Sequence, residues 1–235
     1  MTEIRVVSRD EWLVERKELL EQEKQFTRAR DRLAQYRRDL PWVKLEKEYI
    51  FEGANGPQSL SDLFGSSSQL IIYHFMFGPD WDAGCVSCSF WADNFNGTVP
   101  HLNARDTSLA VVARAPMSKL TPFKQRLGWS FNFVSSEKNS FNEDFDVNFG
   151  PDHKPEDKIT YNYRTTTFPV DEAAGISVFV KGEDGTLYHS YSTYSRGLDN
   201  LNGTYHFIDL TPKGRNEDNE SGTMSWVRHN DNYDT

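Results

Sequence analysis

Cysteine is nearly absent from this sequence of 235 residues, which contains only Cys85 and Cys88. Two cysteines cannot form the disulfide framework of a small secreted protein. Long apolar runs are also missing, since no stretch approaches the roughly 18 apolar residues that a membrane-spanning helix requires. Residues 1–10 include charged side chains and lack the apolar run of a signal peptide. We therefore expect a cytoplasmic protein without a membrane-spanning segment.

Basic residues are outnumbered, because 26 Lys and Arg stand against 35 Asp and Glu and give a net charge of −9. Such a surface repels the phosphates of nucleic acids and anionic lipid headgroups. The glycine-rich phosphate loop, the G-x-S-x-G motif and the H-E-x-x-H motif are absent as well. We expect neither a nucleic-acid nor a membrane partner, and the sequence indicates no cofactor.

Aromatic residues are plentiful, with 16 Phe, 10 Tyr and 6 Trp. They supply enough apolar surface for a packed core and exclude disorder along the whole chain. The length suits one domain with an extension. We divide the chain into a helical extension (1–41), a domain (42–212) and a polar C-terminal tail (213–235) that is partly loose.

The extension is predicted as one helix over residues 10–39, with Asp10 as its N-cap and Pro41 ending the pattern. This segment contains no Gly or Pro, and charged residues of both signs alternate along its outer face. We expect the helix to pack on its own domain or on a partner chain, which would make a homodimer. Its apolar stripe repeats every seven residues through Trp12, Leu19, Phe26, Leu33 and Leu40.

The domain alternates strand and helix patterns. A continuous apolar run over 69–77 predicts a buried strand, a helix over 85–104 follows, and a second buried strand covers 108–114. This βαβ unit and a C-terminal hairpin with a covering helix give a mixed sheet flanked by helices, which is the order of a thioredoxin fold. The remaining predictions are a hairpin over 47–64, a helix over 118–127, a strand over 131–134, an ordered loop insertion over 136–170, a hairpin over 176–191 and a helix over 198–210.

The strongest chemical signal is the C-x-x-C pair directly after the first buried strand. Cys85 falls at the start of the predicted helix, where free backbone N–H groups and the helix dipole stabilise a thiolate. Cys88 lies one turn further on the same face, close enough to close a disulfide. We assign Cys85 as the attacking thiolate and Cys88 as the resolving thiol.

Other interpretations of the pair stay open. It is inert if both thiols are buried, and it binds a metal if a histidine such as His74 or His101 completes the ligands. The chain could also be a non-enzymatic interaction module that uses the helical extension and the 136–170 loop. His229 and Asp231 beside Arg228 could hydrogen-bond across a cleft, but they are most simply part of the polar tail. One aromatic group is a candidate pocket lining, for which core packing is the simpler explanation: Tyr161, Tyr163, Phe168, Tyr188, Tyr191 and Tyr194.

Several segments resemble a bacterial family of unknown function, DUF899, which is placed among the thioredoxin-like proteins. They are WLVERKELLEQEK, LPWVKLEKEY, YHFMFGPDWDAGCVSCSFWADNF, GISVF, YHSYSTYSRGLDNLNGTYHFIDLTPKGR and WVRHND, and they span nearly the whole chain. The resemblance implies a thioredoxin-like fold with an N-terminal helical extension and a cysteine pair at Cys85 and Cys88. It implies no assayed reaction.

Two positions depart from the wider superfamily. Thioredoxins carry a cis-proline before the strand that faces the active site, whereas Ala174 and Gly175 precede Ile176 here. Peroxiredoxins carry Pro and Thr or Ser seven and three positions before their reactive cysteine, whereas Pro79 lies six positions before Cys85 here and position 82 is Asp. A peroxide-reducing site resembling theirs is therefore not supported. The sequence thus predicts a thiol-disulfide oxidoreductase that acts on a disulfide or hydroperoxide and is recycled by an unidentified thiol reductant.

Overall fold

The computed structural model describes residues 4–218 and 222–233 and divides the chain into two units, Met1–Pro41 and Trp42–Thr235. The first unit is formed by helix α1, Arg9–Arg38. Its N-cap is Ser8 rather than the expected Asp10. The Ser8 hydroxyl accepts the Glu11 N–H, and the Glu11 carboxylate accepts the Ser8 N–H at 2.9 Å. This reciprocal capping box satisfies two backbone donors, which a cap at Asp10 does not.

Taken by itself, α1 buries none of its residues. The heptad side chains Trp12, Leu19, Phe26 and Leu33 are therefore exposed along one helix. Ion pairs such as Arg16–Glu23, at 2.7 Å, lie on its surface. The predicted association of this helix with a second copy stays a prediction.

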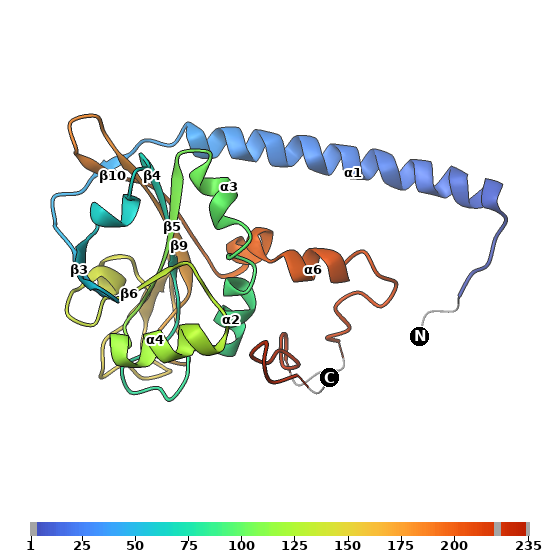
Figure 1. The fold of residues 1–235 in the computed structure, drawn as a ribbon. Helices are drawn as coiled ribbons and strands as arrows, with labels where there is room; N and C mark the ends of the chain where they lie inside the picture. The colour runs from blue at the N-terminus through green and yellow to red at the C-terminus, as the bar shows by residue number, and fades with distance from the viewer. Residues whose placement is uncertain (1–3, 219–221, 234–235) are drawn as a thin grey trace. The chain divides into compact units, whose positions relative to one another are not determined.

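The second unit is built on an eight-stranded sheet of order β1-β10-β9-β4-β5-β6-β2-β3 (Figure 1). β4, β5 and β6 run parallel, while β9 pairs antiparallel with both β4 and β10. Both predicted hairpins, over 47–64 and over 176–191, are present, and the turn dipeptides Asn55-Gly56 and Asp184-Gly185 lie at their turns. The strands are β1 Val43–Lys44, β2 Ile50–Gly53, β3 Gly56–Ser59, β4 Gln69–His74, β5 Thr107–Ala113, β6 Asn132–Ser135, β9 Gly175–Lys181 and β10 Leu187–Tyr194.

Helices fill the connections between these strands. α2 and α3 link β4 to β5, α4 links β5 to β6, and η2 and α6 follow β10. This arrangement of parallel strands, crossover helices and a terminal antiparallel hairpin is a thioredoxin-like fold, as the sequence predicted. The helices are η1 Asp62–Phe64, α2 Val86–Ala92, α3 Val99–Asn103, α4 Met117–Arg126, α5 Phe141–Asp144, η2 Ser195–Leu201 and α6 Gly203–Ile208.

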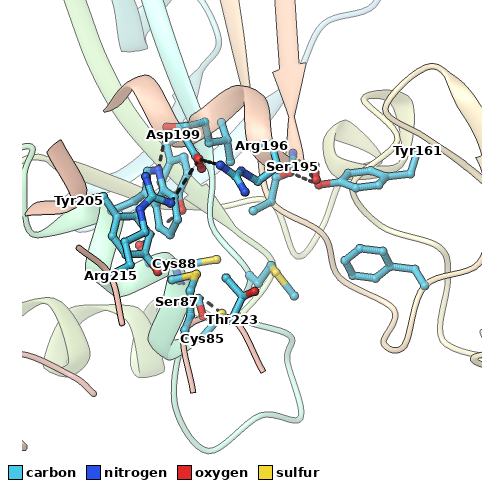
Figure 2. A pocket seen from close by; sticks show the side chains of 17 residues that line it. Cys85, Ser87, Cys88, Tyr161, Ser195, Arg196, Asp199, Tyr205, Arg215 and Thr223 are labelled. Atoms are coloured by element: carbon cyan, nitrogen blue, oxygen red, sulfur yellow. Dashed lines mark hydrogen bonds and ion pairs between the residues drawn. The ribbon is translucent and has the colours of Figure 1, made fainter. Parts of the chain in front are cut away.

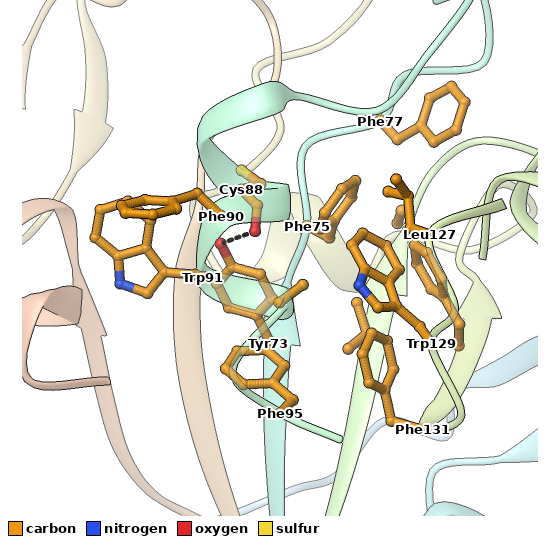
Figure 3. Close-up of a cluster of buried hydrophobic side chains, with 14 of the residues drawn as sticks. Tyr73, Phe75, Phe77, Cys88, Phe90, Trp91, Phe95, Leu127, Trp129 and Phe131 are labelled. Atoms are coloured by element: carbon orange, nitrogen blue, oxygen red, sulfur yellow. Dashed lines mark hydrogen bonds between the residues drawn. The ribbon is translucent and has the colours of Figure 1, made fainter. Parts of the chain in front are cut away.

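Alternating side chains of the central strands bury both faces of the sheet. On β4, Ile71 and Tyr73 point to the face covered by α2 and α4, which we call the α2 face. Leu70 and Ile72 point to the face covered by β2, η1 and α5, which we call the β2 face. Aromatic rings dominate the α2-face cluster, part of which is drawn in Figure 3. A strand buried on both faces explains the continuous apolar run in the sequence.

Two helices predicted as continuous are each divided. The 85–104 prediction is wrong between α2 and α3, where the Asn94 side chain donates to the carbonyls of Phe90 and Trp91, at 2.9 and 3.3 Å. The 198–210 prediction is wrong at Asn202, whose extended backbone separates η2 from α6. The Asn202 side chain accepts the Tyr205 N–H and begins α6. Asn side chains compete with helical hydrogen bonds, so they interrupt helices from within.

The insertion over 136–170 contains α5 and a separate two-stranded sheet, β7 Ile159–Tyr161 with β8 Arg164–Thr166. The sequence predicted an ordered loop without these elements. Asn162 and Tyr163 adopt positive φ angles and close the β7–β8 turn, which a glycine signal would have made easier to recognise. The hydroxyl of Tyr161 donates to the Ala174 carbonyl at 2.8 Å and ties the insertion to the start of β9.

The C-terminal segment over residues 222–233 is packed against the domain. The Trp226 ring lies 5.5 Å from Phe90, and Val227 is buried. His229 is buried too, at 6% exposure, so the interpretation of His229 and Asp231 as part of a loose polar tail is wrong. No helix in the described part of the chain is long and apolar enough to cross a membrane.

Candidate functional site

A tight turn before α2 fixes the backbone that carries Cys85. The Cys85 N–H donates to the Met76 carbonyl at 3.0 Å. A Cβ on Gly84 would lie 2.5 Å from Phe75 Cε1 and 2.9 Å from Phe123 Cε1. Only glycine lets the chain pass this close to the aromatic core, so the core itself determines where the cysteine lies.

Cys85 is the N-cap residue of α2, at the position the sequence indicated. Its Sγ accepts the Cys88 N–H at 3.4 Å, and its carbonyl accepts the Ser89 hydroxyl at 2.9 Å. Cys85 is partly exposed, whereas Cys88 is buried one turn further along. Both are free thiols, and the donors at the helix start are aimed at the outer sulfur.

The pKa values of the two thiols are shifted in opposite directions. A hydrogen bond from the Cys88 thiol lowers the pKa of Cys85 to about 7, helped by the backbone N–H groups of Cys88 and Ser87 and opposed by burial. Burial and the neighbouring Cys85 sulfur raise the pKa of Cys88 well above its usual value. At neutral pH the outer sulfur is therefore substantially a thiolate, and the inner sulfur keeps its proton.

Tyr73 lies under the inner cysteine. Its buried hydroxyl donates to the Cys88 carbonyl at 3.4 Å (Figure 3). Burial, with the negative charge that the Cys88 sulfur can carry, raises the pKa of Tyr73 well above its usual value. The phenol stays protonated, and its single proton opposes the rise of the Cys88 pKa when it turns from the carbonyl to the Cys88 sulfur.

A pocket of about 320 Å³ opens beside the two sulfurs (Figure 2). Most of its lining comes from four segments: α2 with the preceding loop, the insertion, η2 with α6, and the C-terminal segment. Tyr73 on β4, Ala174 before β9 and Arg215 after α6 complete it. Most of its lining is aromatic or aliphatic, and this composition is typical of small-molecule sites. The lining residues are Tyr73, Met76, Cys85, Ser87, Cys88, Trp91, Tyr161, Phe168, Ala174, Ser195, Arg196, Leu198, Asp199, Tyr205, Arg215, Thr223 and Met224.

Charged side chains occupy one wall of the pocket. Arg196 donates to Asp199 at 2.6 Å and its side chain is 78% exposed. Arg215 is held more firmly, with two nitrogens each 2.9 Å from the Asp209 carboxylate and a third 3.7 Å from Asp199. The Arg215 guanidinium also lies 3.8 Å from the centre of the Tyr205 ring.

The C-terminal segment holds the turn before the cysteines. One nitrogen of His229, Nδ1, lies 2.8 Å from the Arg126 guanidinium, and the other, Nε2, lies 3.0 Å from the Gly84 carbonyl. Arginine only donates, so Nδ1 accepts and Nε2–H donates to Gly84. Asp231 adds an ion pair with Arg126 at 3.2 Å. From the sequence, hydrogen bonding of His229 and Asp231 across a cleft is the less favoured alternative to a polar tail, and their partners Arg126 and Gly84 are not predicted.

A buried hydrogen bond between an arginine and a carboxyl group supports the pocket from the side of the insertion. Arg114, just after β5, donates to the Glu172 carboxylate at 2.9 Å, and Asn148 donates to the same oxygen at 3.4 Å. Burial raises the pKa of Glu172 to about 8, against the attraction of Arg114. Glu172 lies two residues before Ala174, so this pair positions a pocket wall. No local sequence pattern predicts this contact between Arg114 and Glu172.

The histidines considered as metal ligands lie apart from the sulfurs. His74 points to the β2 face, where its ring stacks on Phe141 at 5.4 Å, and His101 is exposed on α3. Within residues 4–218 and 222–233, no three His, Cys, Asp or Glu side chains are grouped so that they could hold a metal ion. The metal-binding alternative therefore finds no third ligand in this part of the chain.

The candidate aromatic lining divides into two groups. Tyr161 and Phe168 line the pocket beside the cysteines. Tyr194 is buried in a small cluster with Tyr161, and Tyr188 lies against Trp42 at 5.9 Å. Core packing thus explains Tyr194, and the insertion brings Tyr161 and Phe168 to the pocket, while Tyr163 is 72% exposed and Tyr188 and Tyr191 are half-buried outside the pocket lining.

Comparison with known proteins gives the family. The model of the family described as "Bacterial protein of unknown function (DUF899)" matches residues 1–233, so the chain belongs to this family. No match is found among curated proteins.

Solved structures with similar backbones have low sequence identity. Peroxidoxin BcpB from Mycobacterium tuberculosis is 14% identical, with 72% of this chain and 96% of that chain covered and a TM-score of 0.45. PrxQ from Xylella fastidiosa is 14% identical, with 71% and 95% covered and a TM-score of 0.44. Peroxiredoxin Q from Xanthomonas campestris is 13% identical, with 67% and 90% covered and a TM-score of 0.42. TM-scores of this size carry no conclusion about activity.

Proposed function

We propose that this DUF899 protein is a thiol-disulfide oxidoreductase whose Cys85–Cys88 pair cycles between dithiol and disulfide. One observation carries the proposal: a partly exposed sulfur with a pKa near 7 lines a pocket, and a buried thiol lies one helical turn behind it. Reactive cysteines occupy such partly exposed, donor-rich sites, whereas structural cysteines are sealed.

The first step is attack by the Cys85 thiolate on one sulfur of a substrate disulfide. A Cys85–substrate disulfide forms, the substrate S–S bond breaks, and the second substrate sulfur leaves as a thiolate that takes a proton. A low pKa keeps Cys85 in its nucleophilic form at neutral pH.

The second step is attack by Cys88 on the Cys85 sulfur. The Cys88 thiol gives up its proton, the Cys85–Cys88 bond forms, and the remaining substrate sulfur leaves as a thiol after protonation. The Tyr73 hydroxyl hydrogen-bonds the developing charge on Cys88. Two electrons pass from the cysteine pair to the substrate, and a dithiol reductant returns them in a later exchange.

A hydroperoxide substrate would use the same two sulfurs. Cys85 attacks the terminal peroxide oxygen, becomes a sulfenic acid and releases the alcohol. Cys88 then displaces water from that sulfur and closes the same disulfide. The proposal places this cycle in the cytoplasm, where a thiol reductant as partner keeps the pair reduced.

Exposed apolar side chains on α1 favour a second role beside the redox cycle. Trp12, Leu19 and Phe26 lie on one stripe of a helix that buries none of its residues by itself. We propose that the stripe pairs with a second copy of the chain. Sedimentation of the full chain should give a dimer, and Phe26→Glu should shift it to a monomer. A wild-type monomer would contradict this role.

The redox proposal is tested with single cysteine variants. Reduced wild-type protein, mixed with a small aromatic disulfide, should lose two hydrogens and release two aromatic thiols per chain. Cys88→Ser should stop at a stable mixed disulfide on Cys85, and Cys85→Ser should release less than about 1% of the wild-type burst, because a buried neutral thiol is a poor nucleophile. Equal reactivity of both variants would contradict the assigned roles.

A further inference from the structure

We infer that the pocket takes a small disulfide whose apolar body carries a carboxylate, and that Arg196 binds this carboxylate. This inference rests on the proposed function, because it assumes that Cys85 is the attacking sulfur. It is argued from the enclosure of the pocket, from its lining and from the hydrogen-bond donors of its two arginines.

Enclosure favours a small molecule over a polypeptide. Thr223 and Met224 of the C-terminal segment and Tyr161 and Phe168 of the insertion line the pocket together with Cys85. A volume of about 320 Å³ lies at the lower end of the range for small-ligand sites. The cysteine therefore lies in a pocket, whereas the disulfide of a folded protein needs an open surface.

The backbone beside the pocket is already occupied. The Ala174 carbonyl, at the start of β9, accepts the Tyr161 hydroxyl at 2.8 Å. This hydroxyl also accepts the Ser195 N–H at 3.1 Å. Two backbone groups that could pair with an extended peptide are thus satisfied by one phenol, and peptide docking would have to break both bonds.

The lining beside the sulfurs selects an apolar body. Met76 and Met224 offer flexible thioethers, and Trp91 and Phe168 offer aromatic surface. Methionine side chains adapt to irregular apolar ligands and make favourable contacts with aromatic rings. An aromatic or branched aliphatic substituent on the disulfide suits this lining better than a strongly hydrated one.

Arg196 is the side chain that can receive an anion. Figure 2 shows Arg196 beside Asp199 on the charged wall, with both cysteines in the same view. Among residues 4–218 and 222–233, Arg196 makes one ion pair, to Asp199, and a guanidinium has five N–H donors. Arg215, by contrast, is committed to Asp209, Asp199 and the Tyr205 ring. The pocket lining thus includes two guanidinium groups and one aspartate, and the exposed guanidinium keeps free donors.

The reaction balances without a further reagent. One aromatic disulfide takes two electrons and two protons from the Cys85 and Cys88 thiols and leaves as two aromatic thiols, while the protein retains one disulfide. Binding the carboxylate at Arg196 leaves the apolar body to fill the pocket beside Cys85. Arg196 acts in substrate binding and takes no part in the exchange of electrons.

The test compares two aromatic disulfides that differ in charge: dithiobis(nitrobenzoic acid), which carries carboxylates, and dithiodipyridine, which carries none. Arg196→Gln should slow the reaction with the carboxylated probe by about five-fold, the effect of one exposed charge pair. The reaction with the neutral probe should change by less than about two-fold. Arg105→Gln removes an exposed charge outside the pocket lining and is the matched control for net charge.

A second variant, expected to increase the rate instead of lowering it, distinguishes a loss of carboxylate binding from general structural damage. Asp199→Asn removes the carboxylate that competes for Arg196, so it should raise the rate with the carboxylated probe relative to the rate with the neutral probe. Loss of rate with both probes in both variants, or equal rates with the carboxylated probe in Arg196→Gln and wild type, would overturn the inference. Failure of the wild type to form the Cys85–Cys88 disulfide with either probe would instead contradict the proposed function.

Discussion

The two faces of the central sheet both bury ionisable side chains, but only the α2 face brings one of them to a pocket in a reactive form. Tyr73 and His74 are neighbours on β4, and strand alternation points them to opposite faces. On the α2 face, beside Tyr73, a sulfur with a pKa near 7 reaches a pocket. On the β2 face, His74 is fully buried among aromatic rings.

His74 belongs to a buried chain of hydrogen bonds. Its Nε2 lies 2.8 Å from the Ser177 hydroxyl, which lies 2.8 Å from the Ser192 hydroxyl, which in turn lies 2.7 Å from Nε2 of His189. Burial, with a smaller effect of His189, lowers the pKa of His74 to about 3. The imidazole is therefore neutral at physiological pH.

The difference shows what makes a buried group reactive. Burial alone favours the neutral form, as it does at His74 and at Cys88. Cys85 escapes this effect because hydrogen-bond donors from α2 stabilise its thiolate and because it borders the pocket. The β2 face contributes stability and the α2 face contributes chemistry, and the two should respond separately to substitution.

The largest expected effect on stability comes from the β2 face. His74→Ala removes a buried ring and leaves the Ser177 hydroxyl with one partner fewer. We expect the free energy of unfolding to fall by ~3 kcal/mol, the range for broken buried networks and new cavities. Denaturant titration measures this loss. The alkylation rate of Cys85 in the folded variant should stay at the wild-type value, and a changed rate would break the separation of the two faces.

Gly84→Ala should lower both the stability of the protein and the reactivity of Cys85 on the α2 face. The new Cβ would overlap Phe75 and Phe123, so we expect a loss of ~2 kcal/mol in the free energy of unfolding and a slower reaction of Cys85. Gly97→Ala is the matched control, because a Cβ there meets no atom within 4 Å. Similar denaturation curves for the two variants would show that the close approach at Gly84 does not constrain the turn.

The pH dependence of the free energy of unfolding reports the protonation of His74. The unfolded chain binds a proton at His74 near its ordinary pKa of 6.5, and the folded chain resists it down to about 3. The contribution of His74 to the free energy of unfolding is therefore fully present above about pH 6.5. It falls as the pH drops toward 3, by ~1.4 kcal/mol per pH unit. Unfolding of wild type and His74→Phe at pH 7 and at about pH 5 measures it. A parallel fall in both proteins would contradict a neutral buried His74.

Tyr73→Phe should give the smallest effect. Removing the hydroxyl takes away a donor that opposes the rise of the Cys88 pKa. We expect resolution of the mixed disulfide to slow by about three-fold, equivalent to ~0.7 kcal/mol, while the first attack by Cys85 is unchanged. Stopped-flow separation of the two steps tests this, and an unchanged second step would remove Tyr73 from the proposed mechanism.

Local signals in the sequence explain what could be predicted. The apolar run of β4, the turn dipeptides and the C-x-x-C spacing each fix structure within a few residues. They placed Cys85 at a helix start and gave the fold. The alternation of β4 also implies that His74 faces away from the residues beside Tyr73.

Long-range contacts explain what could not be predicted. Arg196, Asp199 and Met224 reach the pocket from segments more than 100 residues after Cys85. His229 approaches Gly84 only through the folded C-terminal segment. Each of the two helices breaks where an Asn side chain hydrogen-bonds a nearby backbone group. The helical periodicity of the sequence does not show whether such a hydrogen bond forms.

Alkylation of the two cysteines across a pH series, resolved by mass spectrometry, tests the central claim most directly. We expect Cys85 to react with a half-maximal rate near pH 7, while Cys88 in the folded protein stays unmodified until denaturant is added. A midpoint for Cys85 near the ordinary thiol value of about 8.5, or equal labelling of the two sulfurs, would contradict it.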